Sequence, residues 1–369
     1  RKIHRRNPNA IIAVTGCYAQ LKPEAIAEIE GVDIVLSNND KGDLYKRVVE
    51  LKERGKAEVY SCSVEDLTRF FAAYSSGDRT RSFLKVQDGC DYKCAYCTIH
   101  YARGSSRNIP IADIVAEAKE IAAAGQKEIV ITGINTGDFG RTTGERFIDL
   151  LRELDRVDGI ERYRISSIEP NLITDEIIEF CAQSPKFVPH FHIPLQSGST
   201  RILGLMRRRC TAERYRERIA KIRELMPDSF LGVDVIVGFP GEGEEEFMET
   251  YRLLEEVGAS FLHIFPFSER PGTPAVDMPN KVQARISTER VSRLEELSAK
   301  LNRAFTERFI GTEREVLFES TDRNGLMYGY TDNYLRVSAP YDTALINNIC
   351  RVRLVAFDEE GNIRSEIVG

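Results

Sequence analysis

The sequence lacks the features of a secreted or membrane-spanning protein. No stretch approaches the roughly 18 to 20 consecutive apolar residues that a membrane-spanning helix needs, so we expect no membrane partner. The start, RKIHRR, leads into NPNAIIAV rather than a cleavable apolar segment, which excludes a secretory signal peptide there. The first residue is arginine rather than an initiator methionine. We therefore expect the chain to be a fragment whose natural N-terminus is missing.

An overall excess of positive charge is also missing. The formal net charge is -6 at pH 7, which gives no hint of nucleic-acid binding. Eight cysteines at irregular spacing in a large chain without secretion signals indicate a reducing compartment, where clustered thiols bind metal or do chemistry more often than they form disulfides. We therefore predict a cytoplasmic protein. With 369 residues, 42% of them hydrophobic, the chain predicts about two to three domains with real cores.

The first 60 residues show a strand–helix–strand pattern. Apolar runs at 10–16 and 32–37 predict two buried strands, and helix-period segments at 23–29 and 44–54 predict two helices. Residues 1–60 therefore predict part of a small, Rossmann-like α/β domain, and the first residues have the composition of a helix already under way. Residues 61–80 are polar and irregular around AAYSSGDRT, and we interpret them as a linker.

Residues 81–310 show a regular alternation of strands and helices. Apolar runs predict strands at 83–87, 128–133, 162–168, 190–195, 232–239 and 261–267. Helix-period segments lie between most of them, at 111–125, 145–157, 174–183, 211–226 and 244–257, and a long helix is predicted over 282–309. Six βα repeats are too few for a closed eight-fold barrel and predict a partial (β/α)6 barrel.

The last segment, 311–369, alternates with period two between NG, DN and EEGN turns, and it predicts an all-β barrel of roughly five strands.

One loop gathers three of the eight cysteines without a fourth nearby. Cys90, Cys94 and Cys97 form the pattern C-x3-C-x2-C directly after the first barrel strand, where barrel loops carry chemistry. A zinc site and a ferredoxin-type cluster both use four ligands. Three thiolates suit a [4Fe-4S] cluster with one iron open to another ligand. A zinc site with a distant fourth ligand, and cysteines that only fill space, remain as alternatives.

This triplet, with Tyr96 before the third cysteine, resembles the hallmark of the radical S-adenosylmethionine (SAM) superfamily. The resemblance implies that the open iron binds the amino and carboxylate groups of SAM, which the reduced cluster cleaves to a 5′-deoxyadenosyl radical. Cys90, Cys94 and Cys97 would then be both the cluster ligands and the catalytic residues.

Further motifs resemble the methylthiotransferase family, in the same order along the chain. They are TGCYAQ, QDGCDYKCAYCTIHYARGSSRN, TGINTGDFG, ISSIEP, HIPLQSGS, LMRRRCT, DVIVGFPGE and PFSERPGTPA, and the β tail resembles that family's TRAM domain, an RNA-binding barrel. RTRSFLKVQDGCD and ISSIEP are most similar to the branch that acts on N6-threonylcarbamoyladenosine at position 37 of the tRNA anticodon loop. The resemblance implies a tRNA methylthiotransferase: one SAM would methylate a sulfur, and a second would supply the radical that activates C2 of the base.

The resemblance also implies a second [4Fe-4S] cluster that carries the transferred sulfur. Cys17 matches one of its three cysteine ligands, and the other two would lie upstream of Arg1, so this cluster would be incomplete here. Cys62 is the one nearby spare thiol and matches no ligand position of the family. A small residue after a strand is the alternative reading of Cys17.

The SAM site would be built at strand ends. The resemblance implies Tyr96, Gly133, Asn135, Glu169, Gln196 and Gly238 as cofactor-binding residues. The alternative for Gly133 and Gly238 is that they are ordinary turn glycines, and the alternative for Glu169 is that it belongs to a capped loop. Two residues depart from the family pattern: His100 replaces a common proline, and Cys210 replaces an aromatic residue. We interpret both as tolerated substitutions.

A tRNA substrate requires contacts to phosphates. From Arg201 to Arg223 nine Arg/Lys face two Glu, which favours RNA binding, although a solvated helix face is the alternative. The tail has six Arg against ten Asp/Glu, yet its Tyr328, Tyr330 and Tyr334 could stack on bases. The predicted RNA-binding residues are Arg103, Arg107, Arg207, Arg208, Arg209 and Arg336.

Two other functions remain open at this point. One is a methylthiotransferase that acts on a ribosomal protein side chain, which ISSIEP and QDGCD argue against. The other is a non-catalytic iron-sulfur module that binds RNA. For an enzyme we expect an electron donor such as flavodoxin or ferredoxin, and the sequence does not identify the sulfur donor.

Overall fold

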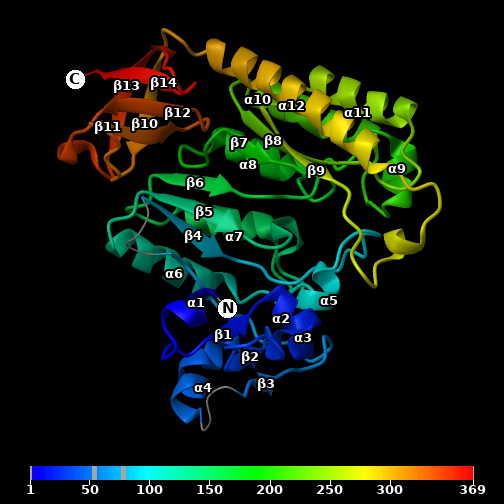
Figure 1. Cartoon of the computed structure of the whole chain (residues 1–369). Coiled ribbons are helices and arrows are strands. Elements are labelled where there is room, and N and C mark those ends of the chain that lie inside the picture. The colour runs from blue at the N-terminus through cyan, green and yellow to red at the C-terminus, as the bar shows by residue number, and fades with distance from the viewer. Residues whose placement is uncertain (1, 52–55, 76–79, 369) are drawn as a thin grey trace.

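The N-terminal part of the chain is a small α/β unit. The computed structural model describes residues 2–51, 56–75 and 80–368. Three short strands pair in parallel in the order β1-β2-β3, and Figure 1 shows this unit in blue below the rest of the molecule. Its elements are α1 (Lys2–Arg6), β1 (Ala13–Thr15), α2 (Cys17–Leu21), α3 (Pro23–Ala27), β2 (Ile34–Leu36), α4 (Leu44–Glu50) and β3 (Glu58–Tyr60).

Both strands and both helices predicted in this unit are present, but α2 and β3 were not predicted. β3 lies where the sequence is polar, and its pairing with the buried β2 decides its structure. The predicted end of helix 44–54 and the centre of the predicted linker, 76–79, lie outside the described residues. The described part of that linker contacts the barrel, since Leu67 is buried and Tyr74 pairs with Leu84.

The central part is the predicted open barrel of six parallel strands. The strands follow one another in chain order as two triplets, and the pairing of Ser167 with His192 joins the third strand to the fourth. The strands are β4 (Arg81–Lys85), β5 (Glu128–Thr132), β6 (Arg162–Ile165), β7 (His190–His192), β8 (Phe230–Val237) and β9 (Phe261–Pro266). The predicted partial (β/α)6 barrel is therefore confirmed.

Helices cover the outside of this barrel because each buries one apolar face against it. In α7 (Phe147–Asp155), for example, Leu150, Leu151 and Leu154 are fully buried. The predicted helices are α6 (Ile111–Ala123), α7 (Phe147–Asp155), α8 (Asp175–Gln183), α10 (Ala212–Leu225), α11 (Glu244–Glu256) and the long α12 (Ala284–Glu307). Two short helices were not predicted, α5 (Ile99–Arg103) and α9 (Thr200–Leu205).

The C-terminal part is a closed five-stranded barrel, as the period-two pattern predicted. Its strands are hydrogen-bonded in the order β10-β11-β12-β14-β13 around a core that includes Val316, Phe318 and Val352. The strands are β10 (Glu313–Phe318), β11 (Leu326–Thr331), β12 (Arg336–Pro340), β13 (Ile349–Phe357) and β14 (Ile363–Ile367). No helix within the described residues has both the length and the apolar character to cross a membrane.

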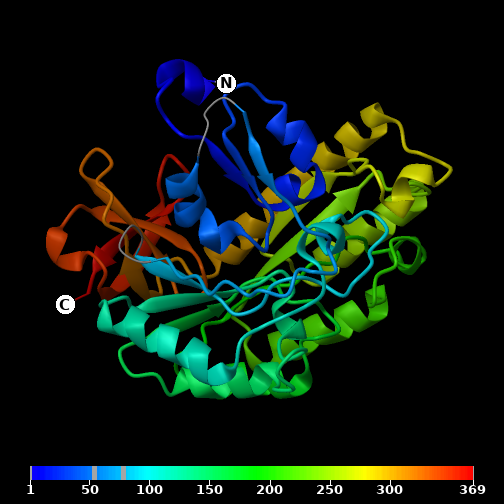
Figure 2. The same ribbon diagram turned by 90° about the horizontal axis from the view of Figure 1, so that it is seen from below.

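Figure 2 shows the small barrel, in orange and red, next to the strands of the central barrel. Two buried arginines of β6 attach it there. Arg162 donates to the backbone carbonyls of Glu315 and Tyr330 at 3.0 and 3.3 Å. Arg164 donates to the carbonyl of Asp332 at 3.1 Å and forms an ion pair with Glu128, whose carboxylate is fully buried. A guanidinium can make both kinds of contact at once, so Arg164 links the sheet to the small barrel.

We predict that Arg164→Ala lowers the free energy of unfolding by about 3–5 kcal/mol, because it leaves the Glu128 carboxylate buried and unpaired. Urea unfolding followed by circular dichroism measures this. The double variant Arg164→Met/Glu128→Gln should lose less than the single one. As a control, Lys300→Ala, which breaks an exposed ion pair with Glu255, should leave the midpoint unchanged. Equal losses in the control and in Arg164→Ala would contradict the assignment.

Candidate functional site

The three-cysteine loop is held in place by backbone hydrogen bonds on both of its sides. It follows the carboxyl end of β4, and the Cys90 N–H donates to the carbonyl of Gly104 at 2.9 Å. Gly89 has φ +76°, and a Cβ there would lie 2.0 Å from the carbonyl oxygen of Ser105, so only glycine fits. At the middle of the loop, the Ala95 N–H donates to the carbonyl of Met206 at 2.9 Å. The loop is therefore closed before any cofactor binds.

Each of the three sulfurs faces a hydrogen-bond donor. Cys90 and Cys97 each accept from the backbone N–H two residues further along, at 3.4 Å. Cys94, which is buried, has the Nη1 of Arg208 at 3.8 Å. Donors aimed at sulfur are the contacts that stabilise thiolates bound to iron. The donor set therefore fits the [4Fe-4S] cluster that the sequence predicts.

Burial keeps these thiols neutral in the absence of metal. It raises the pKa of all three, that of Cys90 to about 12. Iron binding must then displace the thiol protons. Because the thiols stay protonated until iron binds, cluster assembly and thiol deprotonation occur together.

The spacing of the sulfurs does not suit a single zinc ion. In a tetrahedral zinc site with Zn–S bonds of about 2.3 Å, the sulfurs lie about 3.8 Å apart. Among the described residues, the one group of three ligand atoms that all lie within 4.8 Å of one another is elsewhere in the barrel. The three Sγ atoms are thus spread more widely than the ligands of one ion, which argues against zinc.

An ion pair lies beside the cluster loop. Both terminal nitrogens of the Arg208 guanidinium donate hydrogen bonds to the Glu169 carboxylate, with Nη1 at 2.9 Å from Oε1. Only 3% of the Arg208 side chain is exposed. Burial would lower the Arg208 pKa, but Glu169 outweighs it and the pKa is raised. Arg208 was predicted to contact RNA, but its guanidinium is buried between Glu169 and Cys94 rather than exposed to a phosphate.

Gln87 connects the loop to the end of β5. Its Oε1 accepts from the N–H groups of Ile134 and Asn135, and its Nε2 donates to the carbonyl of Gly89 at 2.8 Å. Asn135 is only 3% exposed, and both polar atoms of its amide have no partner. A buried amide of this kind is satisfied by a polar ligand or by an ordered water. This fits the prediction that Asn135 contacts SAM.

The two glycines predicted to make room for SAM face protein instead. A Cβ on Gly133 would lie 3.0 Å from the Gln87 Oε1, and one on Gly238 would lie 2.1 Å from the Ser287 Oγ. Gly238 also has φ +77°, and its N–H donates to the Glu242 carboxylate. Both are therefore explained by packing.

Two other predicted SAM-site residues have distinct environments. Gln196 has φ +72°, an unusual backbone conformation for a residue other than glycine, and pairs with Val235 of β8. Tyr96 packs edge-on against Phe239, and burial raises its pKa beyond the usual range.

Asp88 is the centre of a buried charge network that the sequence did not reveal. Its carboxylate pairs with Lys41, Lys85, Arg103 and Arg107 at 2.8 to 3.8 Å. Burial would raise its pKa, but Lys85, Arg107 and Arg103 hold it below the usual range. Arg107, predicted to contact RNA, is 6% exposed and also donates to backbone carbonyls, so its guanidinium is already occupied within the protein.

Arg103 joins this network to the N-terminal unit. Its Nε donates to the Cys17 Sγ at 3.0 Å, and α5, which carries Arg103, lies beside α2, which begins at Cys17 (Figure 1). Its guanidinium therefore faces the Cys17 thiol and Asp88 rather than solvent. Cys62, the spare thiol, contacts the Ser37 hydroxyl at 3.4 Å.

The basic run from Arg201 to Arg223 is largely neutralised by neighbouring elements. Four of its cations form ion pairs with acidic residues of other elements, namely Glu246, Glu256, Asp175 and Glu179. Arg207 and Arg209 are exposed near the loop, and Arg209 lies over the Tyr92 ring.

Of the three small-barrel tyrosines considered for base stacking, two face the central barrel and the third is buried. Tyr330 and Tyr334 stack on each other at 4.8 Å and lie under Arg81 and Arg164, and Tyr328 is 5% exposed. They do not form an outer face on which bases could stack. Arg336, half-buried, lies over the Tyr328 ring.

Both departures from the family pattern have ordinary environments. His100 contacts the Tyr101 ring at 3.8 Å. Cys210 packs against the barrel core, and burial raises its pKa to about 11.

Comparison with known proteins places this geometry in a family. A family model described as the radical SAM superfamily matches residues 84–254. The threonylcarbamoyladenosine tRNA methylthiotransferase MtaB of Bacillus subtilis (strain 168) is 41% identical over 371 residues, 96% of this chain and 80% of the relative. MtaB of Aquifex aeolicus (strain VF5) is 41% identical over 335 residues, 90% and 80% of the two chains.

A second named activity occurs among the relatives. The tRNA-2-methylthio-N(6)-dimethylallyladenosine synthase of Thermobifida fusca (strain YX) is 37% identical over 322 residues, 86% of this chain and 65% of the relative. Because the similarity extends over most of this chain and includes the cysteine loop, the protein belongs to the radical SAM methylthiotransferase family.

Proposed function

We propose that the protein adds a methylthio group to C2 of N6-threonylcarbamoyladenosine at position 37 of tRNA. The observation that carries the proposal is the three-cysteine loop with a donor at each sulfur, next to the Arg208–Glu169 pair. The MtaB relatives, 41% identical over most of their length, support the choice of substrate.

Cys90, Cys94 and Cys97 would hold a [4Fe-4S] cluster that leaves one position for SAM. When bound, these groups supply the methyl group and the one-electron chemistry that activates an unreactive C–H bond. The protein holds the loop rigidly through Gln87, and the unpartnered Asn135 amide offers a polar contact to the ligand.

The remaining residues of the site would orient SAM and surround the two clusters. We propose that Glu169, held by Arg208, binds the SAM amino group or ribose, and that Gln196 and Tyr96 line the same region. Cys17 would be one ligand of the second [4Fe-4S] cluster, with Arg103 donating to its sulfur. A guanidinium there would stabilise a thiolate against protonation.

We propose four segments: a Rossmann-like domain over 1–60, a linker over 61–80, the radical-SAM barrel over 81–310 and a TRAM-type barrel over 311–369. The closed five-stranded topology supports the last assignment. The cytoplasm would be the site of action, and a flavodoxin or ferredoxin would donate electrons. Arg207, Arg209 and Arg336 remain the proposed RNA contacts.

The function is tested by reconstituting the protein anaerobically with iron, sulfide, SAM and a reductant, with the second cluster's ligands present. Transfer RNA carrying N6-threonylcarbamoyladenosine should yield its 2-methylthio derivative in nucleoside mass spectrometry. Transfer RNA carrying N6-dimethylallyladenosine should remain unchanged. Modification of the second tRNA alone, or of a ribosomal protein instead, would contradict the substrate. Cluster binding without 5′-deoxyadenosine release would indicate a non-catalytic module.

We predict that Arg208→Lys slows 5′-deoxyadenosine formation about 10- to 100-fold, because a lysine cannot hold Glu169 through two parallel bonds. Glu169→Gln should have a similar effect. Arg216→Lys, in the same basic run but exposed and paired with Glu256, should retain the wild-type rate. A wild-type rate in Arg208→Lys would show that the pair is only structural.

We predict that Arg207→Gln reduces the slope of log affinity for tRNA against log salt by about one unit, since one phosphate contact is lost. The control is Arg216→Gln in the same basic run, because Glu256 already pairs with Arg216. Fluorescence anisotropy over a salt series measures both slopes. An unchanged slope for Arg207→Gln would remove this residue from the RNA interface.

A further inference from the structure

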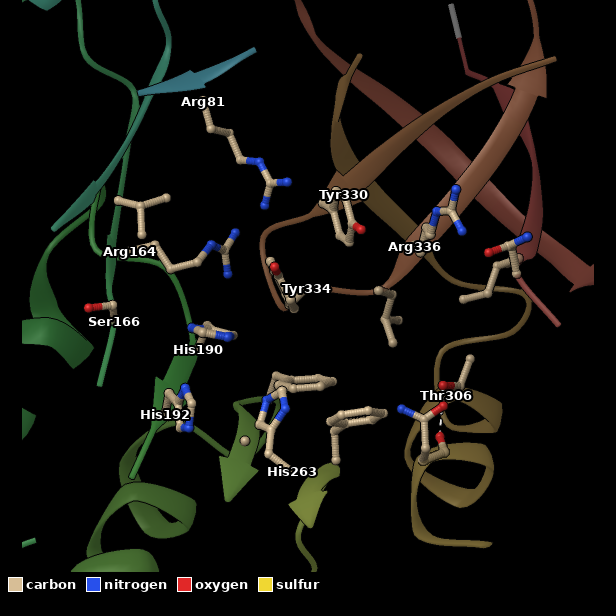
Figure 3. Close-up of a pocket in the computed structure, with 18 of the residues that line it drawn as sticks. Arg81, Arg164, Ser166, His190, His192, His263, Thr306, Tyr330, Tyr334 and Arg336 are labelled. Carbon is tan, nitrogen blue, oxygen red and sulfur yellow. Dashed lines mark hydrogen bonds between the residues drawn. The ribbon is translucent and has the colours of Figure 1, made fainter. Parts of the chain in front are cut away.

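A cavity of about 560 Å³ lies between the inner face of the central barrel and the small C-terminal barrel. Figure 3 shows Arg81, Arg164, His190, His192 and His263 on the central-barrel side, and Tyr330, Tyr334 and Arg336 on the other. The cavity includes the first residues of β4, β8 and β9, whereas the cysteine loop follows the carboxyl end of β4. It is therefore a separate place in the fold.

Three metal-ligand side chains converge at one wall of this cavity: His192 and His263 line it, and Asp234 lies next to them. The register pairs Asp234 of β8 directly with His263 of β9, and His192 of β7 with Gly232. Residues two apart in a strand share a face, so His192, Asp234 and His263 all project to the inner side of the sheet. The intervening Val233 is in the core on the opposite face.

The ligand atoms of these three residues all lie within 4.8 Å of one another. His192 Nε2 is 2.7 Å from Asp234 Oδ1, and the two imidazole rings lie 5.0 Å apart, nearly parallel. Figure 3 shows His192 and His263 facing each other across a short gap. A hydrogen bond explains the His192–Asp234 contact, but it does not explain the second imidazole brought to the same point.

The chemistry of this donor set is that of a transition-metal site. Two imidazoles and one carboxylate bind Zn²⁺, Fe²⁺, Co²⁺ and related dications, and they leave coordination positions open. Gly232 has no side chain, and even a Cβ there would come no closer than 3.7 Å to His192, so the space beside the three ligands stays open to the cavity.

Two of the three arginines that line the cavity have acidic partners, which reduces their repulsion of a metal ion, and the third, Arg336, lies on the small-barrel side over the Tyr328 ring. Arg164 is paired with Glu128 and Arg81 with Glu319. His190, the third imidazole of the cavity, has its pKa lowered by burial and by Arg164 and is neutral. In contrast, the carboxylate of Asp234 has the His192 imidazole as its hydrogen-bond partner.

We propose that His192, Asp234 and His263 bind one divalent transition-metal ion at the wall of this cavity, independently of the iron-sulfur chemistry. The two imidazoles and the carboxylate supply three ligands, and water from the cavity supplies the rest. A metal here would tie β7, β8 and β9 together next to the surface that carries the small barrel.

The test is a Co²⁺ titration of the full chain with its cysteine cluster already assembled, followed by visible absorption. We expect one Co²⁺ per chain with ligand-field bands but no intense thiolate-to-cobalt band, and displacement by Zn²⁺. Asp234→Asn and His263→Gln should each weaken Co²⁺ binding more than about tenfold. The matched control is His190→Gln, in the same cavity but outside the three ligands, which should bind as the wild type does.

X-ray absorption of the wild-type Co²⁺ complex decides the case even if a variant folds poorly, because it should show only nitrogen and oxygen ligands, with imidazole scattering. Absence of Co²⁺ binding, a sulfur ligand, or equal affinity in Asp234→Asn and His190→Gln would each overturn the proposal.

Discussion

The burial, partial or complete, of the three thiols of the cysteine loop is the constraint on which the centre of this molecule depends. Burial opposes ionisation of Cys90, Cys94 and Cys97, so the loop cannot carry three thiolates without cationic iron to compensate them. The fold supplies a hydrogen-bond donor for the negative charge of each thiolate: backbone N–H groups face two sulfurs, and a guanidinium faces the third. The loop's shape is set by glycine and by backbone hydrogen bonds rather than by the metal.

The buried charges around the loop also have partners of opposite sign. Arg208 is compensated by Glu169 on one side, and Asp88 is compensated by four cations on the other. A buried charge left without a partner would cost several kcal/mol, about 3–5 in typical cases. Through Arg103 the second network reaches the Cys17 thiol, so the N-terminal unit and the barrel share one set of charges. The two proposed cluster sites are thus connected through protein side chains.

Patterns that depend on neighbours in sequence were read correctly, and those that depend on neighbours in space were not. The six strands of the central barrel and the five of the small one follow from periodicity. The helices α2, α5 and α9 were missed because each has only five or six residues, too few to show a period. Arg107 and Arg208 look like phosphate ligands in a linear sequence. Only the fold shows that Asp88 and Glu169 take up their charge, although QDGCD and ISSIEP already contained both acids.

The most direct test of this account is the electron paramagnetic resonance spectrum of the anaerobically reconstituted, reduced protein before and after SAM is added. A [4Fe-4S] cluster held by Cys90, Cys94 and Cys97 has an iron that SAM can bind, so the account predicts a clear shift in g values. Cys94→Ala should abolish that signal, while Cys350→Ala, outside the site, should leave it intact. Zinc in place of iron, or a spectrum that SAM leaves unchanged, would contradict the account.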